Sequence, residues 1–170
     1  MTPDPAPRVV LMGMMGSGKS SVGRALSGLT GWRYLDNDEL VSIVSGRRSE
    51  DIDANDGEAA LHQVEAEALQ RALSMPGPLV IGAAAWVVEH PPSVERLRSG
   101  PTVVYLRARP ETLRRRIDQG SGRRRDATDL AWLRARAAER EAAYLALARV
   151  VIDTDGLQPP AIARRILEAL

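Results

Sequence analysis

The chain contains no cysteine among its 170 residues and only two histidines. The lack of cysteine excludes a disulfide framework and a thiolate zinc site. The two histidines, His62 and His90, are too few to form a metal site by themselves. No apolar run is long enough for a membrane span, and the net charge of +1 gives no indication of a nucleic-acid or membrane surface. Gly13 and Gly16 interrupt the apolar residues near the N-terminus, so we expect no signal peptide and a cytoplasmic protein.

Lysine is nearly absent as well, because Lys19 is the only lysine among 23 basic residues. Arginine supplies every other positive side chain. A single lysine kept at one position indicates a site that favours a compact ammonium group over a planar guanidinium. The residues around Lys19 are therefore strong candidates for a functional site.

Residues 13–20 match G-x-x-x-x-G-K-[ST] at every position, and they follow an apolar run at 9–12 that predicts a buried strand. Glycines in such a loop let backbone N–H groups approach an anion, and the helix that begins near Gly18 adds its positive end. The lysine would hold the outer phosphates of a nucleotide, and the Ser20 hydroxyl would bind Mg²⁺. The segment predicts a phosphate loop whose nucleotide ligands are Gly13, Gly16, Ser17, Gly18, Lys19, Ser20 and Ser21.

Strands and helices alternate along the rest of the chain. Hydrophobic periodicity predicts strands at residues 9–12, 32–35, 78–81, 102–106 and 150–153, and helices at 20–29, 39–44, 50–73 (interrupted near 55–57), 92–98, 110–118, 129–148 and 160–170. Such alternation implies a parallel sheet with helices on both faces. We therefore predict one domain over residues 1–170, a three-layer α/β fold around a five-stranded parallel sheet, with a flexible tail at 1–7.

Two carboxylates, Asp36 and Asp38, follow the predicted strand at 32–35. The carboxyl ends of parallel strands form the edge at which such sheets bind ligands. If the strand continues, the two side chains point to opposite sides, one toward a nucleotide and one toward an acceptor. Asp38 has an alternative role as the N-cap of the helix at 39–44.

Three small residues, Gly82, Ala83 and Ala84, follow the predicted strand at 78–81, where many nucleotide-binding proteins carry a metal-binding carboxylate. Asp36 is therefore the candidate for the second metal ligand besides Ser20. The small residues either let the backbone approach a substrate or allow tight packing between helix and sheet. Both interpretations stay open.

Two further segments carry charged groups in a pattern that suits a functional site. Glu58, His62 and Glu65 share one stripe of a helix, which is either a solvated surface or part of a site. Residues 119–127 hold glycines and consecutive arginines, which is the composition of a lid that closes over ATP. A solvated run of charge is the alternative for this loop.

With these features, the chain resembles the shikimate kinases from about residue 9 to residue 170. The similar segments are GMMGSGKSSVGR (13–24), LDNDELV (35–41), DGEAAL (56–61), TVVYL (102–106), AEREAAY (138–144) and VIDT (151–154). The first is common to P-loop kinases, whereas LDNDE at its place after the loop is more particular. The resemblance implies a P-loop kinase fold, ATP with Mg²⁺, and transfer of the γ-phosphate to a hydroxyl of shikimate in aromatic amino acid biosynthesis.

For the nucleotide, the resemblance implies that Lys19 holds phosphates, Ser20 binds Mg²⁺ and Asp36 reaches the metal through water. Arg116 would pack on the adenine ring. Arg123 would be the lid arginine and, together with Lys19, would neutralise charge on the transferring phosphoryl group.

For the acceptor, the resemblance implies a binding region at residues 36–74, in which Asp38 grips the hydroxyl and orients it or accepts its proton. Arg140 would pair with the substrate carboxylate, and residues 82–84 would approach the substrate ring. Catalysis would thus depend on Lys19, Asp38 and Arg123. The acceptor would contact Asp38, His62, Gly82, Ala83, Ala84 and Arg140.

Departures from the family pattern lie on the acceptor and lid side. His62 stands where a second carboxylate-binding arginine is expected, and we expect Glu65 to keep this histidine cationic. Ala83 and Ala84 replace glycines, and Arg124 replaces a proline that usually follows the lid arginine. Three hypotheses remain: shikimate phosphorylation, a kinase of the same build for another hydroxylated metabolite, and a nucleotide-binding regulator without turnover. In either kinase case we expect a monomer whose partner is a small molecule.

Overall fold

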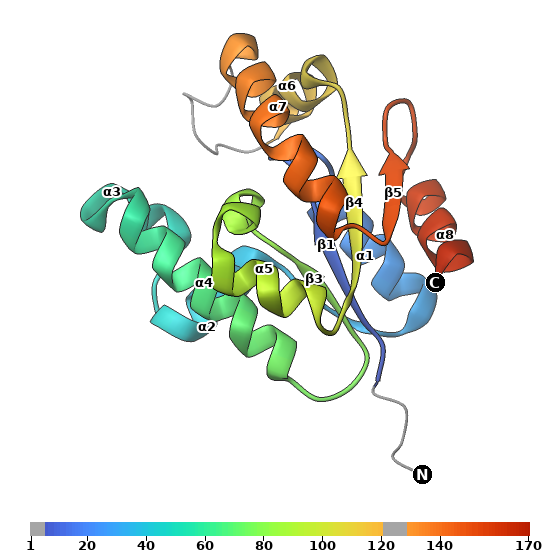
Figure 1. Ribbon diagram of the computed structural model, residues 1–170, viewed down its shortest axis with the longest axis horizontal. Coiled ribbons are helices and arrows are strands. Elements are labelled where there is room, and N and C mark those ends of the chain that lie inside the picture. The colour runs from blue at the N-terminus through green and yellow to red at the C-terminus, as the bar shows by residue number, and fades with distance from the viewer. Residues whose placement is uncertain (1–5, 121–128) are drawn as a thin grey trace.

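The computed structural model describes residues 6–120 and 129–170, and Figure 1 shows a layer of strands with helices on both sides. The strands are β1 (Arg8–Met12), β2 (Arg33–Leu35), β3 (Leu79–Gly82), β4 (Thr102–Arg107) and β5 (Val150–Asp153). All pair in parallel, in the order β2-β3-β1-β4-β5. The predicted five-stranded parallel sheet is therefore confirmed.

Strand β1 lies in the middle of the sheet because its side chains are apolar on both faces. Val10 is opposite Ile81 of β3 and Val103 of β4, and residues 9–12 are all buried. Residues 9 and 11 belong to one core cluster, and residues 10 and 12 belong to the other. A strand that buries both faces needs helices on both sides of the sheet.

Helices α1 (Lys19–Thr30) and α8 (Pro159–Ala169) cover one face of the sheet, and Leu26 and Ile166 are among the side chains that they bury there. The opposite core is formed with α2 (Asn37–Ser45), α3 (Ser49–Asp56), α4 (Glu58–Ser74), α5 (Pro91–Arg98), α6 (Pro110–Gln119) and α7 (Leu130–Leu147). These are the three layers that the sequence predicts. Within the described ranges, no helix combines the length and the apolar character that a membrane span requires.

The sequence does not predict one element, the 3₁₀ turn η1 (Ala85–Glu89) between β3 and α5. Its five residues are too few to show a helical period. Val87 and Val88 fix the turn to the core. It ends at His90, whose Nδ1 accepts from the Ser93 N–H and caps α5. His90 is thus a helix cap, which explains its place beside Pro91.

Gly23 lies in the middle of α1 and is buried against the ring of Tyr34 in β2. A Cβ at this position would lie 2.2 Å from Tyr34 Cε2. The tyrosine ring is held in place because its hydroxyl donates to Asp36 at 2.9 Å. Gly28 of the same helix has no neighbouring atom within 4 Å of its Cβ position. The two glycines of one helix therefore have opposite packing environments.

We expect Gly23→Ala to lower the free energy of unfolding by about 1–3 kcal/mol, because the added methyl group overpacks the contact with Tyr34. Gly28→Ala is the matched control and should raise that free energy by about 0.5–1 kcal/mol, as alanine does in helices. Urea unfolding of both variants measures the difference. If Gly23→Ala is as stable as Gly28→Ala, this packing account is wrong.

Candidate active site

The predicted phosphate loop joins β1 to α1 at the carboxyl edge of the sheet. Gly13, Gly16 and Gly18 have φ values of 150°, 81° and 99°, in the region that favours glycine. A Cβ at Gly13 would lie 2.6 Å from Leu106 O, and one at Gly16 would lie 2.7 Å from Leu113 O. The loop thus packs against β4 and α6 too closely for any side chain at these two positions.

Lys19 and the N-terminal end of α1 give this loop its positive character. Lys19 Nζ donates to Gly13 O at 2.8 Å and to Met14 O at 3.1 Å, so the ammonium group lies over the loop. Ser17 is buried within the loop, and Ser21 is exposed on the first turn of α1. A helix N-terminus with glycine-rich backbone and a lysine is an anion-binding arrangement.

Asp36 is the centre of a hydrogen-bonded cluster at the end of β2. Its Oδ2 accepts from Ser20 Oγ at 2.6 Å and from Tyr34 Oη at 2.9 Å, and its Oδ1 accepts from the Asp38 N–H at 3.2 Å. Burial, followed by the charge of Asp36, raises the pKa of Tyr34, so this hydroxyl remains a donor. The structure therefore brings the two predicted metal ligands, Ser20 and Asp36, into direct contact.

Two predictions for Asp38 are wrong: that it caps α2, and that it points to the opposite side of a strand from Asp36. The N-cap of α2 is Asp36 and not Asp38, because the helix already begins at Asn37. The strand ends at Leu35, so the alternation that would place the two aspartates on opposite sides does not apply. Asp38 lies in the first turn of α2, and its Oδ1 accepts from Ser49 Oγ of α3 at 3.0 Å. It also lines a cavity of about 210 Å³ between α2 and α3.

His62 lies on α4 between a glutamate and a tryptophan. Its ring stacks on that of Trp86 with centroids 4.1 Å apart, and its Nε2 is 3.4 Å from Glu58 Oε1. Glu65, the expected partner of His62, is buried and accepts from Asn37 Nδ2 at 2.8 Å and from the Trp86 indole N–H. Glu65 thus joins α2, α4 and η1, and Glu58 is a carboxylate that pairs with the histidine.

Arg140 of α7 is buried beside the phosphate loop. Its Nε donates to Glu89 Oε1 at 2.7 Å, and its Nη1 lies 3.8 Å from the Sδ atom of Met14 in the loop. Tyr144, one turn further along α7, donates to Ala85 O at 2.6 Å. The residue predicted to bind a substrate carboxylate therefore contacts a carboxylate of the protein itself.

Trp86 and Glu89 contact predicted site residues, and the sequence predicts neither of them. Both belong to η1, the turn without a recognisable period. Glu89 and Arg140 are 51 positions apart in the chain, so no spacing relates them. The nearest sequence signal is the position of both residues shortly after the strand at 78–81, on the edge where ligands bind.

The small residues after β3 pack against protein atoms. A Cβ at Gly82 would lie 2.6 Å from the Tyr34 hydroxyl oxygen. Ala83 is buried, and its N–H donates to Leu11 O at 3.0 Å. Ala84 is half-buried and packs against the core. Tight packing accounts for Gly82 and Ala83, and contact of these residues with a substrate stays a prediction.

Arg116 of α6 lies beside the phosphate loop and the carboxyl end of β5. Its guanidinium donates to Ser17 O at 3.2 Å, to Thr154 Oγ1 at 3.0 Å and to Thr154 O at 2.8 Å. Burial lowers the pKa of this arginine. Arg116 thus ties the loop to β5, and its contact with an adenine ring stays a prediction. Arg123 and Arg124, of the predicted lid at 119–127, lie outside the described residues.

A family model described as shikimate kinase matches residues 15–170 of the chain. The chain belongs to the shikimate kinase family. Shikimate kinases of Moorella thermoacetica and Symbiobacterium thermophilum are 39% and 38% identical to it over 166 residues. These matches cover 95% of this chain and 93% and 95% of the two relatives, respectively. The resemblance seen in the sequence is therefore confirmed.

Solved structures give the same family and fold. A shikimate kinase from Acinetobacter baumannii in complex with shikimate matches with a TM-score of 0.85 and 27% identity, covering 96% of this chain and 92% of that one. A gluconokinase from Sinorhizobium meliloti shares the fold, with a TM-score of 0.67 and 20% identity over 97% of this chain and 91% of that one.

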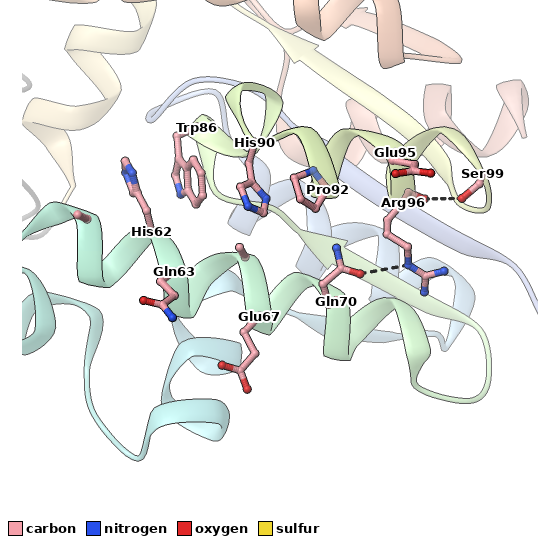
Figure 2. A pocket seen from close by; sticks show the side chains of 12 residues that line it. His62, Gln63, Glu67, Gln70, Trp86, His90, Pro92, Glu95, Arg96 and Ser99 are labelled. Atoms are coloured by element: carbon pink, nitrogen blue, oxygen red, sulfur yellow. Dashed lines mark hydrogen bonds between the residues drawn. The ribbon is translucent and has the colours of Figure 1, made fainter.

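In this member of the shikimate kinase family, a groove of about 870 Å³ runs between α4, η1 and α5 (Figure 2). Its lining residues are Ala59, His62, Gln63, Ala66, Glu67, Gln70, Trp86, His90, Pro92, Glu95, Arg96 and Ser99. Figure 2 shows the rings of His62, Trp86 and His90 in a row at one end of it. No residue of the phosphate loop lines this groove. The candidate active site is therefore identified by the chemistry of Lys19, Ser20, Asp36 and Arg140, and not by the volume of this groove.

Proposed function

We propose that this protein phosphorylates shikimate by transferring the γ-phosphate of ATP to one of its hydroxyl groups. The main observation in support of the proposal is that three features lie together at one edge of the sheet. These are the phosphate loop, the Ser20–Asp36 pair and Arg140, whose guanidinium contacts Met14 of the loop. Membership in the shikimate kinase family, and the likeness to a solved structure that holds shikimate, support the same activity.

The phosphate loop would bind ATP, the group that supplies the phosphoryl unit. Backbone N–H groups of residues 13–20 and the Lys19 ammonium would hold its phosphates, and Arg116 would lie against its adenine. These residues act by positioning and by charge, without a covalent intermediate. The loop is suited to this role because its glycines let backbone N–H groups approach an anion and the start of α1 adds its positive end.

Ser20 and Asp36 would bind Mg²⁺, which neutralises phosphate charge when it is bound. The pair fits this ion because a hydroxyl and a carboxylate oxygen 2.6 Å apart are both hard oxygen donors. Proteins commonly hold Mg²⁺ through one or two such groups, with substrate phosphates supplying other ligands. The Ser20 hydroxyl would bind directly, and Asp36 would act through water while Tyr34 keeps it in place.

The acceptor would bind within residues 36–74 and against α7. Asp38 would receive the hydroxyl group, align it in line with the transferring phosphate and accept its proton. Arg140 and His62 would face the shikimate carboxylate, and Arg123 of the lid would join Lys19 in neutralising charge. The single domain over 1–170, the tail at 1–7, the lid at 119–127, the monomer and the cytoplasmic location stay predictions.

A second candidate function is a kinase of the same build that acts on another hydroxylated metabolite. Two observations favour it: His62 replaces an expected arginine, and Arg140 already pairs with Glu89 at 2.7 Å. Both reduce the positive charge available to an acceptor carboxylate. A regulator without turnover is the third candidate, and the presence of both Lys19 and Asp38 argues against it.

A coupled assay of ADP release with Mg·ATP tests the proposal across shikimate, related cyclitols, gluconate and nucleosides. We expect ADP release with shikimate. Release only with another acceptor would select the second candidate, and ATP binding without turnover would select the regulator. In the same assay, Lys19→Ala and Asp38→Asn should each lower kcat by about 10²–10³-fold, because each removes a group that acts on the transferring phosphate or the nucleophile.

The matched control for Asp38→Asn is Glu168→Gln, an exposed carboxylate of α8 on the other face of the sheet. We expect kcat of this control to stay within about twofold of the wild-type value, as for most exposed substitutions. A near-normal rate for Asp38→Asn would remove Asp38 from the mechanism.

We expect His62→Arg to raise kcat/KM for shikimate about tenfold, because an arginine–carboxylate pair is charge-assisted and bidentate. An arginine can also keep the stacking contact with Trp86. Gln63→Arg adds the same charge at the next, exposed position of α4 and should leave kcat/KM nearly unchanged. An unchanged or lower kcat/KM for His62→Arg, measured by the same assay, would count against shikimate as the acceptor.

A further inference from the structure

The turn η1 contacts both side chains that are predicted to bind a substrate carboxylate. Trp86, near its start, stacks on His62 with ring centroids 4.1 Å apart. Glu89, at its end, accepts a hydrogen bond from Arg140 Nε at 2.7 Å. Tyr144 holds the turn against α7 by donating to Ala85 O at 2.6 Å. A single five-residue turn therefore contacts both side chains that are predicted to bind the carboxylate of the acceptor.

The carboxylate of Glu89 lies beside two arginines of α7. Arg140 contacts it directly, and Arg136 Nη1 of the same helix lies 4.0 Å from its Oε1. The hydrogen bond from Arg140 is the main cause that lowers the pKa of Glu89. The charges of Arg140, Arg136 and His62 act in the same direction, and burial opposes them. A carboxylate of the protein thus pairs with Arg140, one of the two side chains predicted to bind the carboxylate of the acceptor.

Burial differs sharply between the two partners of this ion pair. The Arg140 side chain is 9% exposed, and that of Glu89 is 44% exposed. A buried guanidinium requires a negative partner, because removing it from water without one is costly. The glutamate is half in solvent and can turn away at little cost when another carboxylate takes its place.

We infer that Glu89 is a specificity-determining residue: it acts as an internal carboxylate that holds Arg140 until the carboxylate of the acceptor displaces it. This inference rests on the proposed function, since it needs an acceptor that carries a carboxylate. Glu89 weakens acceptor binding because the acceptor must first break the ion pair between Arg140 and Glu89. Part of the energy gained from Arg140 is lost in this exchange. The effect falls on KM, since Glu89 does not act on the transferring phosphate.

Kinetics of Glu89→Gln and Glu89→Ala with shikimate and with its neutral methyl ester test the inference. Each variant should lower KM for shikimate about fivefold, the scale of a partly exposed ion pair. We expect kcat and KM for ATP to stay within about twofold, as for substitutions away from the reacting groups. KM for the ester should not change, because the ester cannot replace the lost charge. The ratio of the two KM values is therefore the decisive quantity.

Glu139→Gln is the matched control, because it removes an exposed glutamate of α7 that pairs with Arg136 at 3.1 Å. Its KM for shikimate should remain unchanged. An unchanged KM in both Glu89 variants would overturn the inference. A higher KM would also overturn it, since that result would mean that Glu89 positions Arg140 for the acceptor.

A failure of the inference about Glu89 can be distinguished from a failure of the proposed function. If the wild-type protein releases no ADP with shikimate, the proposed function fails, and calorimetric titration of shikimate into wild-type protein and Glu89→Gln then decides about Glu89. Tighter binding by Glu89→Gln would support the displacement of an internal carboxylate. Equal binding, or no binding in either protein, would overturn it.

Discussion

The carboxylate of Asp36 provides the interaction on which the rest of the site depends. It accepts hydrogen bonds from Ser20 in the first turn of α1, from Tyr34 in β2 and from the Asp38 N–H in the first turn of α2. Hydrogen bonds to an ionised group are roughly twice as strong as neutral ones. One side chain therefore fixes the helix that follows the phosphate loop relative to the helix that carries Asp38. Glycine at positions 23 and 82 makes this possible, because Tyr34 fills the space that a Cβ would need.

The predicted acceptor side is organised by aromatic and ionic contacts around η1. Glu65 is buried and joins Asn37 of α2 to the indole of Trp86, and Trp86 in turn stacks on His62. Arg140 links this side to the phosphate loop through Met14. The two parts of the candidate site therefore differ, since the loop depends on backbone geometry and the predicted acceptor side depends on side-chain pairs that are distant in the sequence.

This difference explains which features the sequence predicts. The strands, the glycine-rich turn from β1 to α1 and the break between α3 and α4 depend on local patterns, and the structure confirms these elements. The cap of α2 depends on where the helix begins, and because it begins at Asn37, two residues before the predicted start, Asp36 and not Asp38 is the N-cap. Glu89 lies 51 positions from Arg140, and only the packing of η1 against α7 brings them together. Secondary structure and local turns can therefore be predicted from the sequence, whereas the partners of charged side chains are known only from the tertiary structure.

The central claim is that backbone N–H groups and the only lysine of the chain bind a nucleoside triphosphate next to Asp36. Calorimetric titration of Mg·ATP into the wild-type protein tests this claim most directly. The account predicts heat that saturates at one nucleotide per chain, and heat from Mg·ATP that is lost when Lys19 is replaced by alanine. A titration of the folded wild-type protein without heat of binding would contradict it.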